Sequence, residues 1–402
     1  MLLALLLVAL VPRLAILAAF GSQAIESWEY DGLARSIAAG QGYAILHFGH
    51  LSFAFGDGNL YSFLAGVFYY LFGHQTTMLA VVQAVVASLA APAIFAIGVR
   101  PLGALAAGLG AILAALHPGL LVYTLKLHPL GLDVLLLSLL VLWFSSMSSR
   151  PRDALVAGIA LGLNLMTRPT FFLAGIVALA VRRQPLRGHL LSVGLAAIVA
   201  VTIALPWVGR NWMVLGRPVF MTTGLEDVWK GNNRAASGSS YLASGEDVFS
   251  MMPGQMRTRL SAASELELND VFGDEVLSFI REEPTEFLGL VARKFYYFWW
   301  FSPQSGLFYP SAWLASYQVY DALILGLAAL GALKIIHGGT PDARRLLVVL
   351  GTISLTISLV HALAYVEGRH RWGVEPLLLL LTAQGLLTLA GYLRVRVLAT
   401  RT

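Results

Sequence analysis

Three carboxylates lie directly after the first apolar segment of the chain. The stretch AIESWEYDGLARSIAAGQGY, residues 24–43, contains Glu26, Glu29 and Asp31, whereas the sequence on either side is mostly hydrophobic. Glu26 precedes a predicted helix, at the mouth of the first membrane segment. Its basicity would rise in a partly dry pocket, which makes it a candidate general base. For Glu29 and Asp31 a purely structural role is weighted equally with a catalytic one, because acidic side chains stabilise the positive N-terminal end of a helix.

The same carboxylates could also hold a divalent cation, Mg²⁺ or Mn²⁺, so the sequence leaves metal dependence open. No histidine-based metal site is expected, because the nine histidines include no HExxH motif and no close ligand pair. The absence of cysteine excludes disulfides, a thiolate nucleophile and cysteine-ligated metals.

Two arginines flank a histidine near the C-terminal end. Arg369, His370 and Arg371 occur in YVEGRHRWGVEP, between the last two predicted spans. Because basic residues are disfavoured in short outer loops, this cluster calls for an explanation. Pairing with Glu367 and Glu375, or with lipid headgroups, is one. The other is a guanidinium pair that clamps a phosphate, the group that arginine forks fit best.

A third polar cluster follows the seventh predicted span. Arg210 lies at the membrane edge, and Lys230, Asn232 and Asn233 follow in a glycine-flanked loop. Amides in such a loop could bind sugar hydroxyls, although glycine and asparagine are also ordinary turn residues. Lys294, within RKFYYFWW, adds a cation at the same surface beside aromatics that are more typical of an interfacial belt.

Several charged residues close to or inside the spans receive a structural interpretation. Lys126, His128 and Arg168 lie near outer span ends, where long side chains snorkel to the interface. Asp133 and Asp321 are expected to be paired structural groups.

Composition places these residues in a polytopic membrane protein. Of the 402 residues, 57% are hydrophobic and only 12% are charged, against about a quarter charged in soluble domains. The net charge of +5 does not imply a nucleic-acid partner, because the basic residues lie mostly in short loops between spans. We therefore expect an all-α membrane protein. Candidate spans are roughly 2–20, 76–98, 102–117, 130–147, 154–167, 169–182, 188–208, 313–336, 346–365 and 374–392.

The loop charges orient these spans. Alternating them from a cytoplasmic N-terminus places on the cytoplasmic side the basic residues Arg100, Arg150, Arg152, Arg182, Arg183, Arg187, Lys334, Arg344, Arg345, Arg394, Arg396 and Arg401. Counting 285–301 as a crossing would break this pattern, so this aromatic segment is predicted to lie in the outer interface.

The chain is thus predicted to have five parts. They are the first transmembrane helix (1–20), a first outer loop with two juxtamembrane helices (21–75), transmembrane helices (76–208), an outer loop or lid with the interfacial aromatic helix (209–312), and C-terminal transmembrane helices with a cytoplasmic tail (313–402). The lid is expected to contain a helix near 265–282 that ends at Pro284.

Motifs in this order resemble those of GT-C glycosyltransferases. An acidic pair and a tyrosine precede LARSIAAGQGY. The motifs NLYSFLAGVFYYLFG, LMTRPT, PWVGRNWMVLGRPV, WKGNN, EPTEFLGLVARKFYYFW and EGRHRWGVEPLLLLL follow along nearly the whole chain. The pattern is similar to glycosyltransferase family 39, which includes the protein O-mannosyltransferases and the bacterial aminoarabinose transferases that act on lipid A. The resemblance implies a GT-C bundle of about 10–11 transmembrane helices with juxtamembrane helices on its outer face.

The resemblance also implies an activity. A sugar on a polyprenyl phosphate would be transferred at the outer face of the membrane, with inversion, to a lipid, glycan or protein acceptor. Matching the family's acidic pair places the base at Glu26, with Glu29 in reserve. Asp57 replaces a basic residue common in the family, so the donor phosphate would rely on Arg369 and Arg371, aided by Lys294 or Arg210. The sugar and acceptor contacts are assigned to Asp31, Tyr61, Lys230, Asn232, Asn233 and His370.

Other functions use similar residues. A transporter or flippase of an anionic lipid-linked substrate would also need outer arginines, but paired halves and broken helices at matched positions are not evident in the sequence. A polysaccharide ligase or polymerase would use the same donors, and only the order of the motifs argues against it. The expected location is the bacterial cytoplasmic (inner) membrane, with a periplasmic active site.

Overall fold

The computed structural model describes residues 1–402 except 147–150, 182–185, 243, 306–309 and 400–402. The basic loop residues Arg150, Arg182, Arg183 and Arg401 therefore lie outside the described residues. The described helices are α1 (Leu2–Phe20), α2 (Glu29–Ala38), α3 (Asn59–Phe72), α4 (Thr76–Ser88), α5 (Ala90–Leu102), α6 (Ala104–Ala115), α7 (Pro118–Val122), α8 (Leu130–Ser146), α9 (Pro151–Thr167), α10 (Pro169–Val181), α11 (Leu186–Leu215), α12 (Gly224–Lys230), α13 (Gly254–Ala262), α14 (Glu265–Glu282), α15 (Pro284–Trp299), α17 (Ser311–Gly338), α18 (Pro341–Leu363), α19 (Gly368–Trp372) and α20 (Glu375–Ala399).

Strands are few and short among the described residues. They are β1 (Glu26–Ser27), β2 (Ile45–His47), β3 (His50–Ser52) and β4 (Lys126–Leu127). β2 and β3 form a hairpin, and β1 pairs in parallel with β4. The prediction of an all-α polytopic protein is confirmed.

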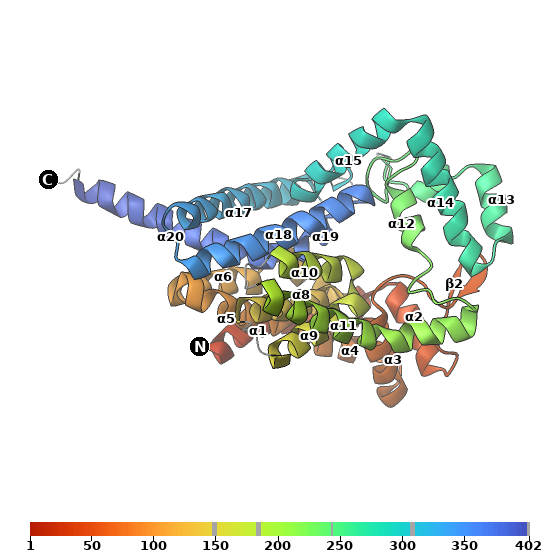
Figure 1. The fold of residues 1–402 in the computed structure, drawn as a ribbon, viewed down its shortest axis with the longest axis horizontal. Coiled ribbons are helices and arrows are strands. Elements are labelled where there is room, and N and C mark those ends of the chain that lie inside the picture. The colour runs from red at the N-terminus through yellow and green to blue at the C-terminus, as the bar shows by residue number, and fades with distance from the viewer. Residues whose placement is uncertain (147–150, 182–185, 243, 306–309, 400–402) are drawn as a thin grey trace.

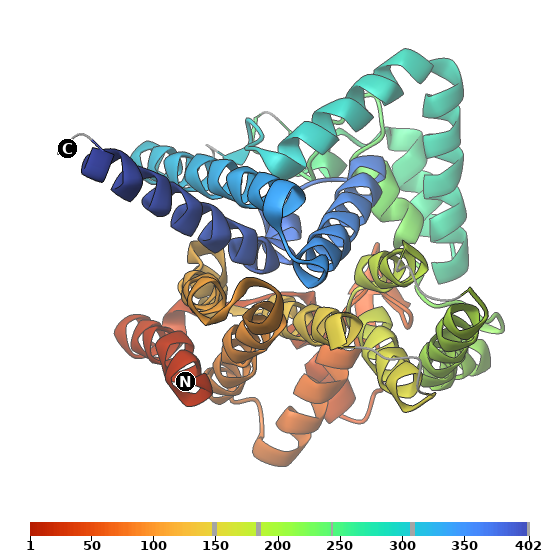
Figure 2. The same ribbon diagram turned by 60° about the vertical axis from the view of Figure 1, so that its left-hand side comes forward.

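The long helices form two layers that share one core. Figures 1 and 2 show α17, α18 and α20 in one layer, and α1, α4–α6 and α8–α11 in the other. Contacts of α6 with α20 and of α10 with α18 join the layers. Small residues allow close approach, because a Cβ at Gly331 or Gly385 would overlap the backbone of the partner helix where α17 meets α20.

The number of full-length spans is smaller than the ten or eleven expected. By length and apolar composition, the described residues contain six helices able to cross a membrane, or seven if the bent pair α6 and α7 is one span. The expected spans near 130–147, 154–167 and 169–182 correspond to α8, α9 and α10, which have 17, 17 and 13 residues. These described lengths are below the about 20 residues of a perpendicular crossing.

The break between α6 and α7 is stabilised by an arginine of α1. The two segments are bent by 42° at the break between Ala115 and Pro118. Arg13, which is buried, donates to the carbonyl oxygens of Ala115 (3.0 Å) and Ala9 (2.6 Å). Because a helix break inside a membrane frees backbone carbonyls that water cannot reach, this side chain supplies the missing donor.

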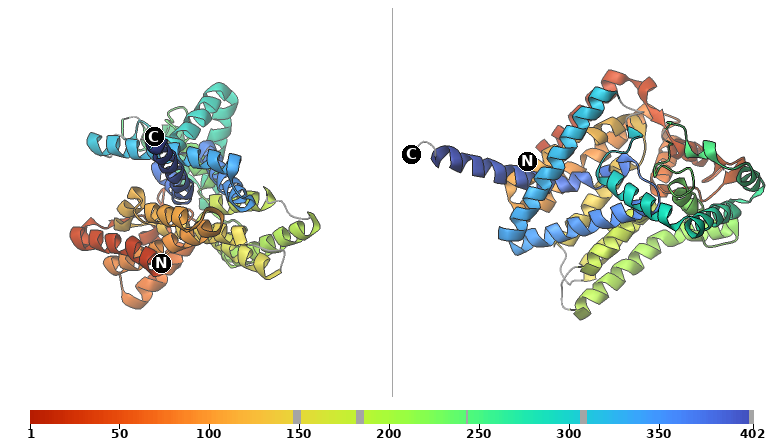
Figure 3. Two further views of the ribbon diagram at one scale, coloured as in Figure 1. Left: turned by 90° about the vertical axis from the view of Figure 1, so that its left-hand side faces the viewer. Right: turned by 90° about the horizontal axis from the view of Figure 1, so that it is seen from above.

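One end of the bundle carries α2, α3, the β2–β3 hairpin and the lid helices α12, α13 and α14. Figures 1 and 3 show these elements opposite the end that bears both termini. Within the two predicted outer segments, the structure forms the surface helices α2 and α3 and the lid helix α14. Ser264 and Glu267 form a capping box at the start of α14, and Pro284 begins α15, which is not among the candidate spans.

The carboxylate of Glu265 fastens the lid to the first outer loop. This side chain, 7% exposed, accepts hydrogen bonds from the backbone N–H of Phe53 and Ala54 (both 2.7 Å) and from the Thr222 hydroxyl (2.9 Å). The lid has its own core around Trp229 and Phe272. The lid is therefore a folded unit attached to the bundle at defined points.

Replacing Glu265 with alanine should destabilise the protein by about 2 kcal/mol, because three buried donors lose a charged acceptor. The measurement is the midpoint of thermal unfolding in detergent. Asp274→Ala is the control: Asp274 lies on the same helix but is exposed and pairs with Arg259, so its loss should cost less than about 0.5 kcal/mol. Equal midpoints for the two variants would contradict the fastening role.

Candidate active site

A polar pocket opens where the lid, the first outer loop and the bundle meet. It is an open pocket with an empty volume of about 560 Å³. The lining comes from α2, the loop before α3, the segment before α8, the junction of α9 and α10, α12, and the α18–α19 region. Its residues are Trp28, Glu29, Tyr30, Phe55, Gly56, Asp57, His128, Arg168, Thr223, Glu226, Asp227, Lys230, Tyr365, Arg369 and His370.

Glu29 supplies a carboxylate to this pocket from the first residue of α2. Burial raises its pKa above the ordinary range, and the charges of Arg369 and Lys230 oppose the shift. Among the described residues, no side chain forms an ion pair with it. Glu29 is thus the pocket carboxylate that keeps its oxygens available to a ligand.

Arg369 lines the same pocket from α19. Its guanidinium forms an ion pair with Glu367, approaches the Tyr365 hydroxyl (3.5 Å) and lies over the Trp28 ring (4.9 Å). Burial opposes its charge, but Glu367 holds the pKa of Arg369 well above its usual value. Burial keeps the pKa of the neighbouring His370 well below its ordinary value.

Arg168 brings a second guanidinium into the pocket from the junction between α9 and α10. Its Nε contacts Asp133 (2.8 Å), and its Nη1 contacts Asp57 (3.3 Å). Asp57 also accepts a hydrogen bond from the Tyr30 hydroxyl (3.2 Å). Arg168 therefore joins the bundle to the first outer loop at the floor of the pocket.

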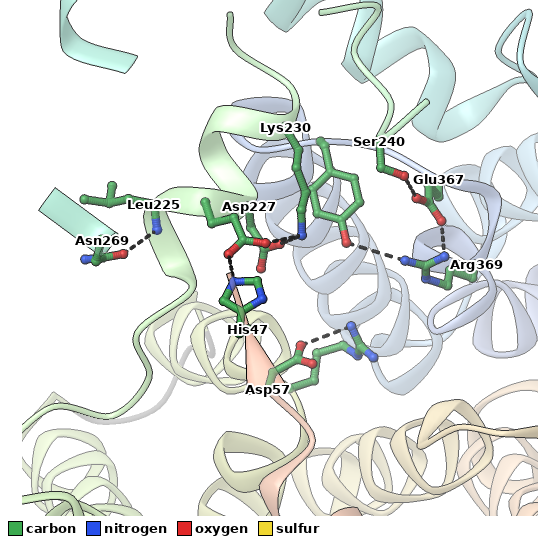
Figure 4. Close-up of polar contacts among 12 residues, drawn as sticks. His47, Asp57, Leu225, Asp227, Lys230, Ser240, Asn269, Glu367 and Arg369 are labelled. Atoms are coloured by element: carbon green, nitrogen blue, oxygen red, sulfur yellow. Dashed lines mark hydrogen bonds and ion pairs between the residues drawn. The ribbon is translucent and has the colours of Figure 1, made fainter. Parts of the chain in front are cut away.

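The lid contributes a third cation. Lys230, the last residue of α12, pairs with Glu226 (3.1 Å) and Asp227 (2.9 Å), and Glu226 pairs with His47 of the hairpin (2.7 Å). Burial opposes the charge of Lys230, but the two carboxylates hold its pKa well above the usual value. Figure 4 shows Lys230, Asp57 and Arg369 arranged around one common space.

The structure brings together only part of the residues that the sequence singled out. Glu29, Lys230, Arg369 and His370 line the pocket. The predicted site residues outside its lining are Glu26, Asp31, Tyr61, Arg210, Asn232, Asn233, Lys294 and Arg371.

Glu26 lies in β1, two residues before Trp28, with a side chain that is 52% exposed. Its carboxylate pairs with Lys126 of β4, and the Lys126 ammonium is 5.5 Å from the centre of the Trp28 ring. Glu26 is therefore at the same end of the bundle as the pocket, but its carboxylate is held by a lysine outside the lining.

Arg371 points away from Arg369, into the bundle. It pairs with Asp321 (3.0 Å) and Glu375 (3.2 Å), both of which are buried. Two residues two positions apart on a helical turn cannot share a face, which separates the expected guanidinium pair. The structure thus shows the alternative arrangement, in which Arg369 and Arg371 pair with Glu367 and Glu375.

Asp133 and Asp321 are paired with arginines, as predicted.

Three other predicted site residues have structural partners. Buried Asp31 contacts the Tyr69 hydroxyl (2.7 Å), Arg35 and His74 (both 3.1 Å). Tyr61 donates to Gln83 (2.8 Å). Arg210 donates to the carbonyl oxygens of Phe53 and Tyr43 and so holds the first outer loop.

The asparagines and the aromatic-helix lysine are also turned into the protein. Asn232 and Lys294 are buried against each other, with the Lys294 ammonium 2.6 Å from the Asn232 amide oxygen. Asn233 donates to the Trp229 carbonyl (2.8 Å). The interpretation of the Gly231–Asn233 stretch as a turn describes these contacts better than sugar binding does.

The sequence interpretation missed several lining residues, notably Asp57, Arg168, Glu226 and Asp227. The sequence predicts that Arg168 snorkels to the interface, but its side chain is only 12% exposed and pairs with Asp133 and Asp57. The position of Arg168 in the sequence carried a signal for its role in the pocket. It lies between two apolar stretches that are too short to span, and a charged side chain at such a junction turns toward the protein interior.

The described residues contain no group of three His, Asp or Glu side chains arranged to hold a metal ion. Glu26, Glu29 and Asp31 in particular do not converge, since Glu26 pairs with Lys126 and Asp31 with its own buried partners.

Comparison with known families supports a glycosyltransferase. Residues 58–209 match a family model described as dolichyl-phosphate-mannose-protein mannosyltransferase. The matched segment begins one residue after Asp57 and includes His128 and Arg168 of the pocket. No curated protein matches the chain. Together with the helical polytopic architecture, the match confirms the resemblance indicated by the motifs. The match over residues 58–209 and the helical architecture together support a membrane glycosyltransferase of the GT-C type, similar to glycosyltransferase family 39.

Proposed function

We propose that this glycosyltransferase moves a sugar from a polyprenyl-phosphate donor to an acceptor at the outer face of the cytoplasmic (inner) membrane of a bacterium. The observation that carries the proposal is the pocket itself, which combines the available carboxylate of Glu29 with the cations of Arg369 and Arg168. The helices α2 and α12, which help to line the pocket, lie at the end of the bundle opposite both termini (Figure 3), where a lipid tail could stay in the membrane while its headgroup enters.

The cations suit the leaving group of this reaction. When the bond between the sugar and the phosphate breaks, negative charge grows on the phosphate oxygens, and nearby guanidinium groups stabilise it. Arg369 and Arg168 are held in place by carboxylates, so their geometry is set before the donor arrives. Lys230 adds positive charge from the lid. In this assignment Arg371 supports the fold and does not contact the donor.

Glu29 is the base in this proposal. The acceptor hydroxyl or amine must lose a proton as it attacks the anomeric carbon from the side opposite the phosphate, which inverts that carbon. A carboxylate whose pKa is raised by burial is a better proton acceptor than an ordinary one. Glu26 is the alternative base, since it lies beside the pocket, but its ion pair with Lys126 would have to break.

The lid and the first outer loop keep water from the reacting sugar. Trp28, Phe55 and Tyr365 give the pocket apolar walls, while Asp57 and Asp227 offer acceptors for sugar hydroxyls. Excluding water favours transfer to the acceptor over hydrolysis of the donor. The acceptor is a lipid, a glycan or a protein.

Glu29→Gln should reduce kcat for transfer by about 100- to 10,000-fold, because the base is lost, and should leave donor binding within about threefold. Transfer is measured with a radiolabelled polyprenyl-phosphate sugar, and binding with the same donor on purified protein. Glu26→Gln is the matched comparison, expected to retain most of the activity. The reverse ranking of the two variants would move the base to Glu26.

Donor affinity should depend on Arg369. Arg369→Met is expected to raise the donor KM by about 10- to 100-fold, in line with the loss of one charge-assisted contact to phosphate. Arg234→Met removes an exposed lid arginine that pairs with Glu282 and Glu283, and it should leave KM unchanged. A donor KM unaffected by Arg369→Met would rule out the phosphate contact.

The pH dependence of transfer should report Glu29. The base must be deprotonated, so kcat/KM of the wild-type protein should fall as pH decreases through the pKa of Glu29, at a pH above the ordinary range of glutamate. The residual activity of Glu29→Gln should lack this acidic limb. An identical limb in the wild type and in Glu29→Gln would assign the titration to another group.

A further inference from the structure

Lys294 of α15 is a completely buried lysine with no carboxylate partner among the described residues. Its side chain is 0% exposed. The ammonium donates to three oxygens, the carbonyls of Gly231 (3.1 Å) and Ala364 (2.9 Å) and the amide oxygen of Asn232 (2.6 Å). Because all three N–H donors are used, this lysine has none left for a donor phosphate.

Asn232 completes the buried polar unit. Its amide nitrogen donates to the carbonyl oxygens of Val228 and Leu363, both at 2.7 Å. One end of the side chain therefore holds the C-terminal end of α12 to the C-terminal end of α18, and the other end accepts from Lys294. We call Lys294 and Asn232 the clamp.

The backbone around the clamp leaves no space for adjustment. A Cβ at Gly231 would overlap the carbonyl oxygen of Ala364, and a Cβ at Gly238 would approach the Lys294 side chain to 2.9 Å. The Val366 N–H donates to the Gly238 carbonyl (3.0 Å). Lid and bundle backbones thus touch directly at this point.

The clamp adjoins the pocket on both sides. Lys230 directly precedes Gly231, and Tyr365 directly follows Ala364, and both line the pocket. The Lys230 ammonium is 5.5 Å from the centre of the Tyr365 ring, and Arg369 reaches the Tyr365 hydroxyl at 3.5 Å. A shift at the clamp would therefore change the position of Lys230 relative to Arg369.

Packing alone does not account for a lysine here. Burial lowers the pKa of Lys294 to about 7, which shows that the surroundings disfavour its charge. Methionine would fill the same volume without this desolvation cost. What lysine adds is three donors directed at two backbone segments and one amide.

We propose that Lys294 and Asn232 are positioning residues, which set the distance between the lid wall of the pocket at Lys230 and the bundle wall at Arg369. The inference rests on the proposed function, because the two walls are taken to hold the donor. Neither residue touches the substrate. Their effect on transfer would pass through Lys230, Tyr365 and Arg369.

The kinetic test compares Lys294→Met with Arg293→Met. Arg293 is the preceding residue on α15, is exposed, and pairs with Glu286. Arg293→Met therefore removes a positive charge from the same helix without changing the clamp. Per folded molecule, Lys294→Met should raise the donor KM at least about tenfold and lower kcat, whereas Arg293→Met should change neither more than twofold. A purely structural lysine would reduce only the amount of folded protein, and that result would overturn the inference.

The second test measures the lid without relying on activity. The chain has no cysteine, so spin labels can be attached at cysteines introduced for the exposed residues Leu277 of α14 and Leu359 of α18. Lys294→Met and Asn232→Leu should broaden the distance distribution between the labels, and Arg293→Met should not. If Lys294→Met does not fold, Lys294→Gln, which keeps two donors, replaces it in both experiments.

The outcomes separate the two claims. An unchanged distance distribution, or a broadened one with an unchanged donor KM, would overturn the positioning role. A wild-type protein that transfers no sugar from any polyprenyl-phosphate donor would overturn the proposed function, while the distance measurement would still report whether the clamp holds the lid.

Discussion

The end of this protein that carries the lid is organised by the need to pair buried cations. A buried charge is costly unless an opposite charge and hydrogen bonds compensate it. Each pocket cation meets this need with carboxylates from nearby segments: Arg168 with Asp133 and Asp57, Lys230 with Glu226 and Asp227, and Arg369 with Glu367. These pairs also join the pieces of the site, since Arg168 links two bundle helices to the first outer loop, and the partner of Lys230 reaches the hairpin through His47.

Pairing also decides which groups remain available for chemistry. Glu29 lines the same pocket but has no ion-pair partner among the described residues, and this distinguishes it from the other carboxylates of the site. Its raised pKa follows from the same burial that forces the cations to pair. In the proposed reaction, a phosphate would share the preorganised cations with their carboxylates, and the free carboxylate would take the proton.

The sequence predicted the architecture better than the side-chain directions. Hydropathy and breaker residues indicated helices at the positions of α2, α3, α14 and α15, because these depend on local patterns. The clusters at 26–31, 230–233 and 369–371 all belong to the end of the bundle that carries the lid. However, proximity to the surface does not say which side of a helix a residue occupies, so Arg371 and Asn232 were assigned to a site that they do not line. Arg168 was missed because its role depends on Asp57, more than a hundred residues away in the chain.

The most direct test is a structure of the protein bound to a polyprenyl-phosphate sugar, determined by cryo-electron microscopy or crystallography. The account predicts the phosphate within hydrogen-bonding distance of the guanidinium groups of Arg369 and Arg168, with the anomeric carbon turned toward Glu29. A phosphate bound at Arg371 inside the bundle, or a headgroup outside the pocket, would contradict it.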